Sequence, residues 1–289
     1  MKTIELFKKK TVFSYEVFPP KRNADVSTIY ETLAVLKNLG PDFISVTYGA
    51  GGGENGGKTF QIASAIKKDY GIESVAHLSG IGHTKAEIHN RLDELRSAGI
   101  ENILALRGDM PQDGYTAGDF PYACDLISYM KEHGDFHVIA ACYPEGHIET
   151  NSKAEDIRNL KTKVDAGADQ LISQLFFDND YFYSFMERCR STGITVPVEA
   201  GIMPVVNKKQ MERMTLLCGA SVPKKLAAMM DRYGNDPASM RDAGIAYAID
   251  QIADLIAQGV EGIHLYTMNQ PYISQKIYEA THHLLEPRS

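Results

Sequence analysis

Eight short apolar runs, each ending in polar residues, recur along this chain at intervals of roughly 30 residues, the length of one βα unit. In the clearest run, residues 102–107, apolar side chains lead into Arg107, Gly108 and Asp109, so charge begins only where the run ends. That pattern is typical of a strand buried on both faces of a parallel sheet. The other runs are residues 12–18, 43–48, 74–78, 137–143, 170–177, 196–202 and 262–267.

Helical patterns lie between these runs. Thr84 and Ser152 each stand three residues before a glutamate, the capping-box pattern that begins a helix. Three more helical segments, 207–218, 222–233 and 237–258, fill the long gap between the seventh and eighth runs. This alternation predicts an α/β fold, a single (β/α)8 TIM barrel with extra helices between strands 7 and 8, spanning residues 1–289 as one domain. An open doubly wound sheet is the alternative.

The composition narrows the range of functions. A formal net charge of −7 argues against a surface for nucleic acid or for an anionic membrane. The four cysteines form no C-x-x-C pair and no H-E-x-x-H motif occurs, so no metal site or redox dithiol is predicted. Residues 1–10 carry no apolar signal core, and no run of ~18 apolar residues exists, so the sequence predicts a cytoplasmic protein without a membrane span.

Polar residues at the ends of the predicted strands form a candidate active site, because barrel active sites gather at the carboxyl ends of the strands. Two carboxylates, Glu16 and Asp109, would face one mouth, which suits acid–base chemistry or stabilisation of a cation. The simpler interpretations are a core histidine at His77 and a structural ion pair between Arg107 and Asp109. The full set at the rim is Glu16, Thr47, Tyr48, His77, Arg107, Asp109, Tyr143, Glu145, Gln174, Tyr266 and Asn269.

A glycine-rich loop after the second run offers a competing interpretation. From Gly52 to Thr59 the sequence matches the phosphate-loop pattern G-x-x-x-x-G-K-[ST], with Lys58 as the basic residue. Backbone N–H groups of such a loop can surround a phosphate. The alternative function is therefore a nucleotide-binding protein. Two features count against this function. The loop follows the second strand of the chain, and no later strand ends in a clear magnesium-binding aspartate.

The motifs together resemble one family, methylenetetrahydrofolate reductase of the bacterial, FAD-dependent type. They run in order from one end of the chain to the other, and the set is specific although each motif alone is weak. The matching motifs are SYEVFPPK at 14–21, SVTYGA at 45–50, AHL at 76–78, LRGD at 106–109, YPEGH at 143–147, KVDAGA at 163–168, QLFFD at 174–178, GIMP at 201–204 and HLYTMN at 264–269.

The resemblance implies a barrel that holds FAD at the carboxyl face of its strands and works in one-carbon metabolism and methionine biosynthesis. It implies ping-pong reduction of 5,10-methylenetetrahydrofolate to 5-methyltetrahydrofolate, with NADH or NADPH reducing the FAD first. Glu16 would be the general acid that protonates the folate ring nitrogen N10. Asp109 would stabilise the resulting N5 iminium cation and tune the flavin potential.

The same resemblance implies the binding residues. The implied FAD contacts are Thr47, Tyr48, Ala50, His77, Arg107, Gly108, Asp109, Tyr122, Ala123, Tyr143, His147, Asp156, Asn159 and Lys163. Asp156, Asn159 and Lys163 recur at helical spacing, so we expect them on one helical face. The implied folate contacts are Asp109, Gln174, Gln210, Tyr266 and Gln270.

The sequence departs from the family pattern at three positions. Met214 replaces a frequent Phe, Thr162 replaces a common Arg, and Gln270 stands where an Arg is frequent. As partners, the sequence predicts a small-molecule folate substrate, no nucleic acid, no membrane and a homo-oligomer. A partner subunit that supplies electrons stays an open alternative.

Overall fold

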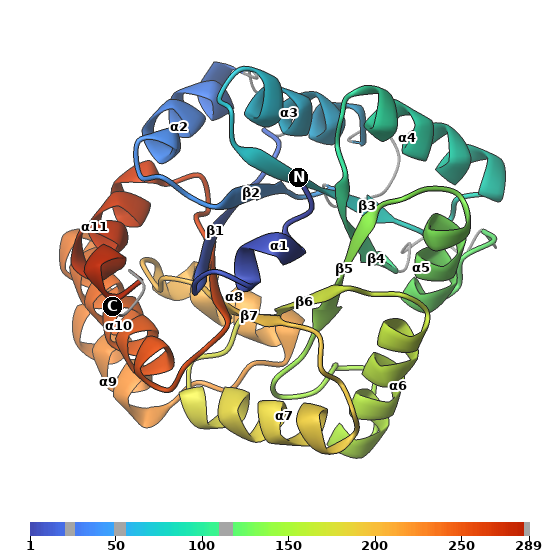
Figure 1. The fold of residues 1–289 in the computed structure, drawn as a ribbon. Helices are drawn as coiled ribbons and strands as arrows, with labels where there is room; N and C mark the ends of the chain where they lie inside the picture. Colours follow the sequence, from blue (N-terminus) through green and yellow to red (C-terminus); the bar gives the residue numbers. More distant parts are fainter. Residues whose placement is uncertain (21–26, 49–55, 110–117, 286–289) are drawn as a thin grey trace.

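The computed structural model describes residues 1–20, 27–48, 56–109 and 118–285. These residues form a closed barrel in which every strand pairs in parallel with its neighbour in sequence, and the last strand returns to pair with the first (Figure 1). The predicted TIM barrel is thereby confirmed, and the open doubly wound sheet is excluded. The strands are β1 (Val12–Val17), β2 (Phe43–Val46), β3 (Glu73–Ser79), β4 (Asn102–Leu106), β5 (His137–Cys142), β6 (Gln170–Ser173), β7 (Val198–Ile202) and β8 (Gly262–Tyr266).

Helices follow the strands and form a ring around the barrel (Figure 1). The extra helices predicted between strands 7 and 8 are present as α8, α9 and α10. The helices are α1 (Ile4–Phe7), α2 (Ser27–Lys37), α3 (Gly56–Lys68), α4 (Lys85–Ser97), α5 (Ala123–Glu132), α6 (Lys153–Asp165), α7 (Asn179–Ser191), α8 (Lys208–Cys218), α9 (Lys224–Tyr233), α10 (Pro237–Ala257) and α11 (Pro271–Thr281), with a short 3₁₀ turn at His282–Leu284.

Two details of the sequence prediction need correction, one strand end and one capping box. The apolar run 170–177 leaves the sheet after Ser173, because hydrophobicity continues into a buried loop. There, Leu175 and Phe177 belong to an apolar cluster with residues of the loop after β7 and of α8, α9 and α10. The capping box at Thr84 forms in full. At Ser152 only half of it forms: the Ser152 side chain accepts from the Glu155 N–H, whereas the Glu155 carboxylate accepts from the Asn151 N–H.

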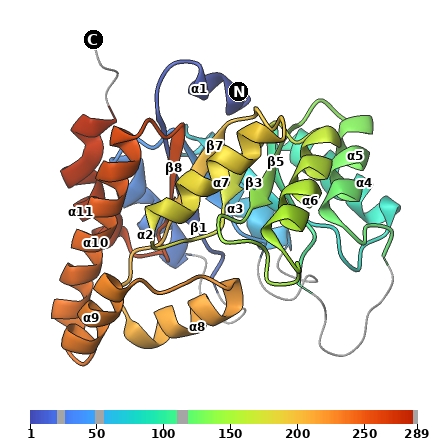
Figure 2. The same cartoon turned by 90° about the horizontal axis from the view of Figure 1, so that it is seen from below.

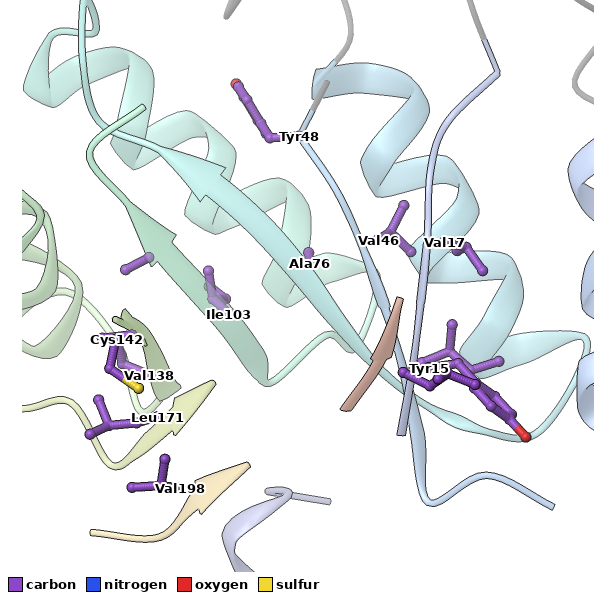
Figure 3. Close-up of a cluster of buried hydrophobic side chains, with 14 of the residues drawn as sticks. Tyr15, Val17, Val46, Tyr48, Ala76, Ile103, Val138, Cys142, Leu171 and Val198 are labelled. Carbon is purple, nitrogen blue, oxygen red and sulfur yellow. The ribbon is translucent and has the colours of Figure 1, made fainter. Parts of the chain in front are cut away.

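The alternation along each strand divides its side chains between two environments. On β1, Phe13, Tyr15 and Val17 belong to the main apolar cluster between barrel and helices. Tyr15 and Val17 are labelled in Figure 3. Val12 instead packs with Phe43 and other strand residues in a separate cluster. Because side chains alternate, Ser14 and Glu16 share the inner face with Val12. Glu16 therefore lies at the carboxyl end of the barrel interior.

The two ends of the barrel differ in what covers them. Helix α1 lies across the amino ends of the strands, where the Thr3 N–H donates to Asn102 Oδ1 (2.9 Å). Helix α8 lies at the opposite end, beside the carboxyl ends of the strands (Figure 2). Within the described ranges, no helix has both the length and the apolar character that crossing a membrane requires.

Candidate active site

A cavity of about 1400 Å³ opens at the carboxyl ends of the strands. Its lining includes both predicted carboxylates, so Glu16 and Asp109 face the same mouth, one buried and the other exposed. The residues predicted for the site that line this cavity are Glu16, Thr47, Tyr48, His77, Arg107, Gly108, Asp109, Tyr143, His147, Gln174 and Tyr266.

Glu16 lies deep in the cavity between two histidines. His77 Nε2 on β3 and His264 Nε2 on β8 each lie 3.5 Å from Glu16 Oε2. Burial lowers the pKa of His77 to about 4, a larger effect than the opposing attraction of Glu16. His77 is therefore a neutral imidazole at physiological pH, and its Nε2 has no hydrogen-bond partner among the described residues. It is a core histidine and a cavity residue at once.

The wall after β5 is built from a small cluster of rings and charges. The Tyr143 and His147 rings meet edge to face at 4.6 Å, and Lys163 Nζ lies 5.4 Å from the Tyr143 ring centroid. Lys163 Nζ also donates to the Ala141 carbonyl (2.8 Å), while the His147 N–H donates to Asp156 Oδ1 (3.2 Å). Burial raises the pKa of Asp156 and lowers that of Lys163. Both residues support the wall from behind.

Several predicted residues lie elsewhere. Asn159 is exposed and does not line the cavity, so the expected common face with Asp156 and Lys163 does not reach the cavity as a unit. Tyr122 is 64% exposed, just before α5, and Ala123 begins that helix outside the lining. Ala50 lies outside the described residues.

The predicted folate contacts divide between two pockets. Gln174 and Tyr266 line the main cavity, with the Tyr266 hydroxyl donating to the Ser173 carbonyl (2.6 Å). Gln210 and Gln270 line a second pocket of about 460 Å³, which also includes Arg241. Of the departures from the family pattern, Met214 lines the main cavity, Gln270 lies in the second pocket and Thr162 is exposed.

Sequence reasoning missed a polar group inside the barrel. Ser14, Glu199 and His264 are fully buried, and Ser14 Oγ lies 2.7 Å from both Glu199 Oε1 and His264 Nδ1. The available signal was the presence of polar residues in the middle of otherwise apolar runs. These residues lie within the strands and not at the strand ends, where barrel active sites gather.

Comparison with known proteins assigns the chain. The family model described as methylenetetrahydrofolate reductase matches residues 1–282. The chain belongs to this family. It is 39% identical to the 5,10-methylenetetrahydrofolate reductase of Pectobacterium carotovorum over 264 residues, 91% of this chain and 88% of the relative.

A plant relative agrees with this assignment, and a solved structure shares the fold. Methylenetetrahydrofolate reductase (NADH) 1 of Arabidopsis thaliana is 37% identical over 90% of this chain, which spans only 46% of the plant protein. A solved structure from Clostridium thermocellum, an uncharacterised protein that binds two copies of 5-methyl-5,6,7,8-tetrahydrofolic acid, matches 98% of this chain and 99% of its own with a TM-score of 0.59 and 14% identity. At that identity, the likeness shows the fold alone.

Family membership favours the reductase interpretation over the nucleotide loop. Residues 52–55 of this loop lie outside the described residues, whereas residues 56–59 begin α3, where Thr59 is buried. Its hydroxyl donates to the Thr47 carbonyl (2.8 Å), a bond that ties α3 to the end of β2. Thr59 therefore has a structural role where a phosphate loop would need a magnesium ligand.

Proposed function

We propose that this protein reduces 5,10-methylenetetrahydrofolate to 5-methyltetrahydrofolate with FAD as its cofactor and NADH or NADPH as the electron donor, and that residues 1–289 act as one catalytic domain. The observation that carries the proposal is a single cavity, in a barrel of this family, that contains a buried carboxylate at Glu16 and an exposed one at Asp109. The name of the Arabidopsis relative includes NADH, which supports a nicotinamide as the electron donor of this protein.

The cavity fits FAD in size and in chemistry. Its volume exceeds the ~300–1,000 Å³ of most small-ligand pockets, as a dinucleotide requires. Arg107 supplies a guanidinium that can bind two phosphate oxygens at once. Two buried polar atoms on the lining, Tyr48 Oη and His77 Nε2, have no hydrogen-bond partner among the described residues. They can form hydrogen bonds with a bound ring system. Thr47, Tyr143 and His147 complete the wall that would hold the cofactor.

Bound FAD would supply the redox chemistry, by which a hydride equivalent from NADH or NADPH would reach the methylene carbon of the folate. The protein must open the five-membered folate ring before that carbon can accept the hydride. Glu16 protonates N10, the N10–carbon bond breaks, and an iminium cation remains at N5. Asp109 stabilises this cation by its negative charge. A positioned acid of this kind is typically worth about 10²–10⁴-fold in rate.

The visible spectrum of the purified protein tests this function. We expect a yellow protein whose flavin absorbance is bleached by NADH or NADPH without oxygen and restored by methylenetetrahydrofolate, with 5-methyltetrahydrofolate as the product. A colourless protein that fails to take up added FAD would overturn the proposal. Bound FAD that neither nicotinamide can reduce would instead indicate a barrel that binds a flavin without catalysing this reaction.

A further inference from the structure

The carboxyl end of strand β1 is bonded to residues that follow strand β8. The pairing of these two strands ends with Glu16 beside Tyr266. Beyond that pair, the Thr267 hydroxyl donates to the Glu16 carbonyl (2.6 Å), and the Thr267 N–H donates to the same oxygen (3.3 Å). Thr267 is buried, so water competes little for these bonds. The main chain of the proposed acid is therefore bonded directly to the loop after β8.

Asn269 extends this connection to Phe18. The Phe18 N–H donates to Asn269 Oδ1 (2.9 Å), and Asn269 Nδ2 donates to the Phe18 carbonyl (2.8 Å). One side-chain amide thus takes the place that a neighbouring strand would have beside Phe18. The two bonds also fix the direction of the amide, because its oxygen must accept and its nitrogen must donate. We call Thr267 and Asn269, with their bonds to the main chain of Glu16 and Phe18, the β8 clasp.

The β8 clasp is built on an unusual main-chain conformation. Among the non-glycine residues that the structure describes, only Met268 (+50°) and Asn269 (+53°) have a positive φ. Asparagine tolerates this conformation, whereas it is unfavourable for methionine. Such a conformation persists where surrounding contacts enforce it, and it is concentrated at functional sites. Here the enforcing contacts include the Asn269 N–H, which donates to the Thr267 hydroxyl oxygen (3.1 Å).

The β8 clasp acts at the point where β1 reaches the cavity. Glu16, Phe18 and Met268 all line the cavity at the carboxyl ends of the strands. Because side chains alternate along an extended chain, Glu16 and Phe18 share one side only while residues 16–18 stay extended. On the β2 side, the Thr47 N–H donates to the Val17 carbonyl (3.1 Å). The clasp is the matching support on the β8 side.

We propose that Asn269 and Thr267 are positioning residues for Glu16, which fix the end of β1 so that the carboxyl group meets N10 of the folate. This inference rests on the proposed function for the role of Glu16, whereas the clasp itself does not depend on it. Proton transfer needs the acid within hydrogen-bond distance of the nitrogen, so a small displacement of the acid slows that step. Neither positioning residue is among those that line the cavity, so both act through the main chain.

Substitutions at the two positions separate the clasp from the backbone conformation. Asn269→Gly keeps a residue that readily adopts a positive φ but removes both bonds to Phe18. Thr267→Val removes the hydroxyl bond to Glu16 with little change of shape. Thr267→Ser keeps that hydroxyl and should therefore behave like the wild type.

The chain offers a matched control for each substitution. Asn38→Gly changes an exposed asparagine after α2, whose side chain donates to the Ala34 carbonyl (3.2 Å). Thr11→Val removes a hydroxyl that donates to the Val260 carbonyl (3.5 Å) next to the amino ends of β1 and β8. Both controls lose a side-chain bond to the main chain away from the cavity, so both should keep wild-type kinetics.

Half-reaction kinetics give the first readout. In Asn269→Gly and Thr267→Val we expect NADH to bleach the flavin at the wild-type rate, because that step takes no proton from Glu16. Reoxidation at saturating methylenetetrahydrofolate should slow roughly tenfold to a hundredfold, as expected for a misplaced reacting group, while the KM for the folate changes by less than about twofold. Equal slowing of both half-reactions, or the same loss in Thr267→Ser as in Thr267→Val, would overturn the proposal.

A double-mutant cycle shows whether the clasp acts through Glu16. Where Glu16→Gln has already removed the acid, Asn269→Gly should slow folate reduction no further, because no proton donor remains to be positioned. If Asn269→Gly slows the reaction by the same factor with and without Glu16, it acts by another route and the assignment is wrong.

Hydrogen exchange of the Phe18 amide tests the clasp in the purified protein without folate. We expect this amide to exchange roughly tenfold faster in Asn269→Gly than in the wild type, as the loss of one hydrogen bond predicts, and at the wild-type rate in Asn38→Gly. Equal exchange in Asn269→Gly and the wild type would overturn the clasp. Failure of the proposed function would appear instead as a wild-type flavin that methylenetetrahydrofolate does not reoxidise.

Discussion

Arg107 and Glu149 form a two-pronged ion pair at the mouth of the cavity, with Nη1–Oε2 and Nη2–Oε1 distances of 2.5 and 2.7 Å. The bond from Arg107 lowers the pKa of Glu149, and the bond from Glu149 raises the pKa of Arg107. A guanidinium fork that binds a carboxylate in this way binds a phosphate in the same way. Glu149 therefore occupies the face of Arg107 that the proposed FAD pyrophosphate needs.

Glu149→Gln should tighten FAD binding, because a neutral amide competes less well than a carboxylate for Arg107. Glu149 is about half exposed, so solvent weakens the pair and the expected gain is only about twofold to fivefold. Arg107→Ala should weaken binding by about ten to a hundredfold, the loss of a charged hydrogen bond. Titration of the apoprotein with FAD measures both.

The matched control is Glu187→Gln, an exposed glutamate on α7 in the outer ring of helices. It should leave FAD affinity unchanged. If Glu149→Gln binds FAD no better than the wild type, the ion pair does not compete with the cofactor.

Glu16→Gln should separate the two half-reactions. NADH should still bleach the flavin, because that step needs no proton from Glu16. Reoxidation by methylenetetrahydrofolate should slow by about 10²–10⁴-fold, since an amide cannot donate the proton that N10 requires. Stopped-flow absorbance of each half-reaction measures this, and equal slowing of both steps would contradict the assigned role.

Asp109→Asn should raise the flavin reduction potential and slow folate reduction, because the substitution removes a negative charge near the proposed flavin and iminium cation. An increase on the order of 30 mV corresponds to about 1.4 kcal/mol for a two-electron couple. Equilibration of the bound flavin with reference dyes measures the potential. The control is Asp135→Asn, at a 93% exposed aspartate that pairs with Lys2. An unchanged flavin potential in Asp109→Asn would argue against a role of Asp109 in tuning that potential.

The barrel could be predicted because its two repeating signals are local. Each strand is a short apolar run, and each helix shows its own periodicity and its own start signal, as at Thr84. The rim of the site followed from topology, since parallel strands bring their carboxyl ends together and thereby place Glu16 and His77 in one cavity.

The remaining features depend on contacts that no local pattern records. Arg107 and Glu149 are 42 residues apart, and only the path of the chain brings them together. Glu199 is an isolated charged residue in an apolar strand, and its hydrogen-bond partner Ser14 lies 185 positions away in the sequence. Asn159 keeps the helical spacing of Asp156 yet is exposed, because sequence spacing alone does not show where the helix meets the barrel.

His77→Gln should change how stability depends on pH. The folded protein resists protonation of His77 until about pH 4, whereas the unfolded chain binds that proton near pH 6.5. Unfolding therefore takes up a proton between these values, and His77 lowers the free energy of unfolding as the pH falls through this window. As the pH falls from 6.5 to 4, the free energy of unfolding of His77→Gln should rise by roughly 3 kcal/mol relative to that of the wild type. Urea denaturation of the wild type and of His77→Gln at several pH values measures this difference, and identical pH profiles for the two proteins would contradict it.

Gly108→Ala should destabilise the protein and weaken FAD binding. Gly108 has a φ of +94°, and an added Cβ would lie 2.1 Å from Ser79 Oγ and 2.7 Å from Ile81 Cγ2, so the loop after β4 must shift. We expect a loss of about 1–3 kcal/mol in the free energy of unfolding. Gly99→Ala separates backbone strain from the clash, because Gly99 also has a positive φ (+77°) but nothing lies within 4 Å of its added Cβ. Thermal denaturation and FAD titration of both variants measure the effect, and equal losses would show that the contact with Ser79 is unimportant.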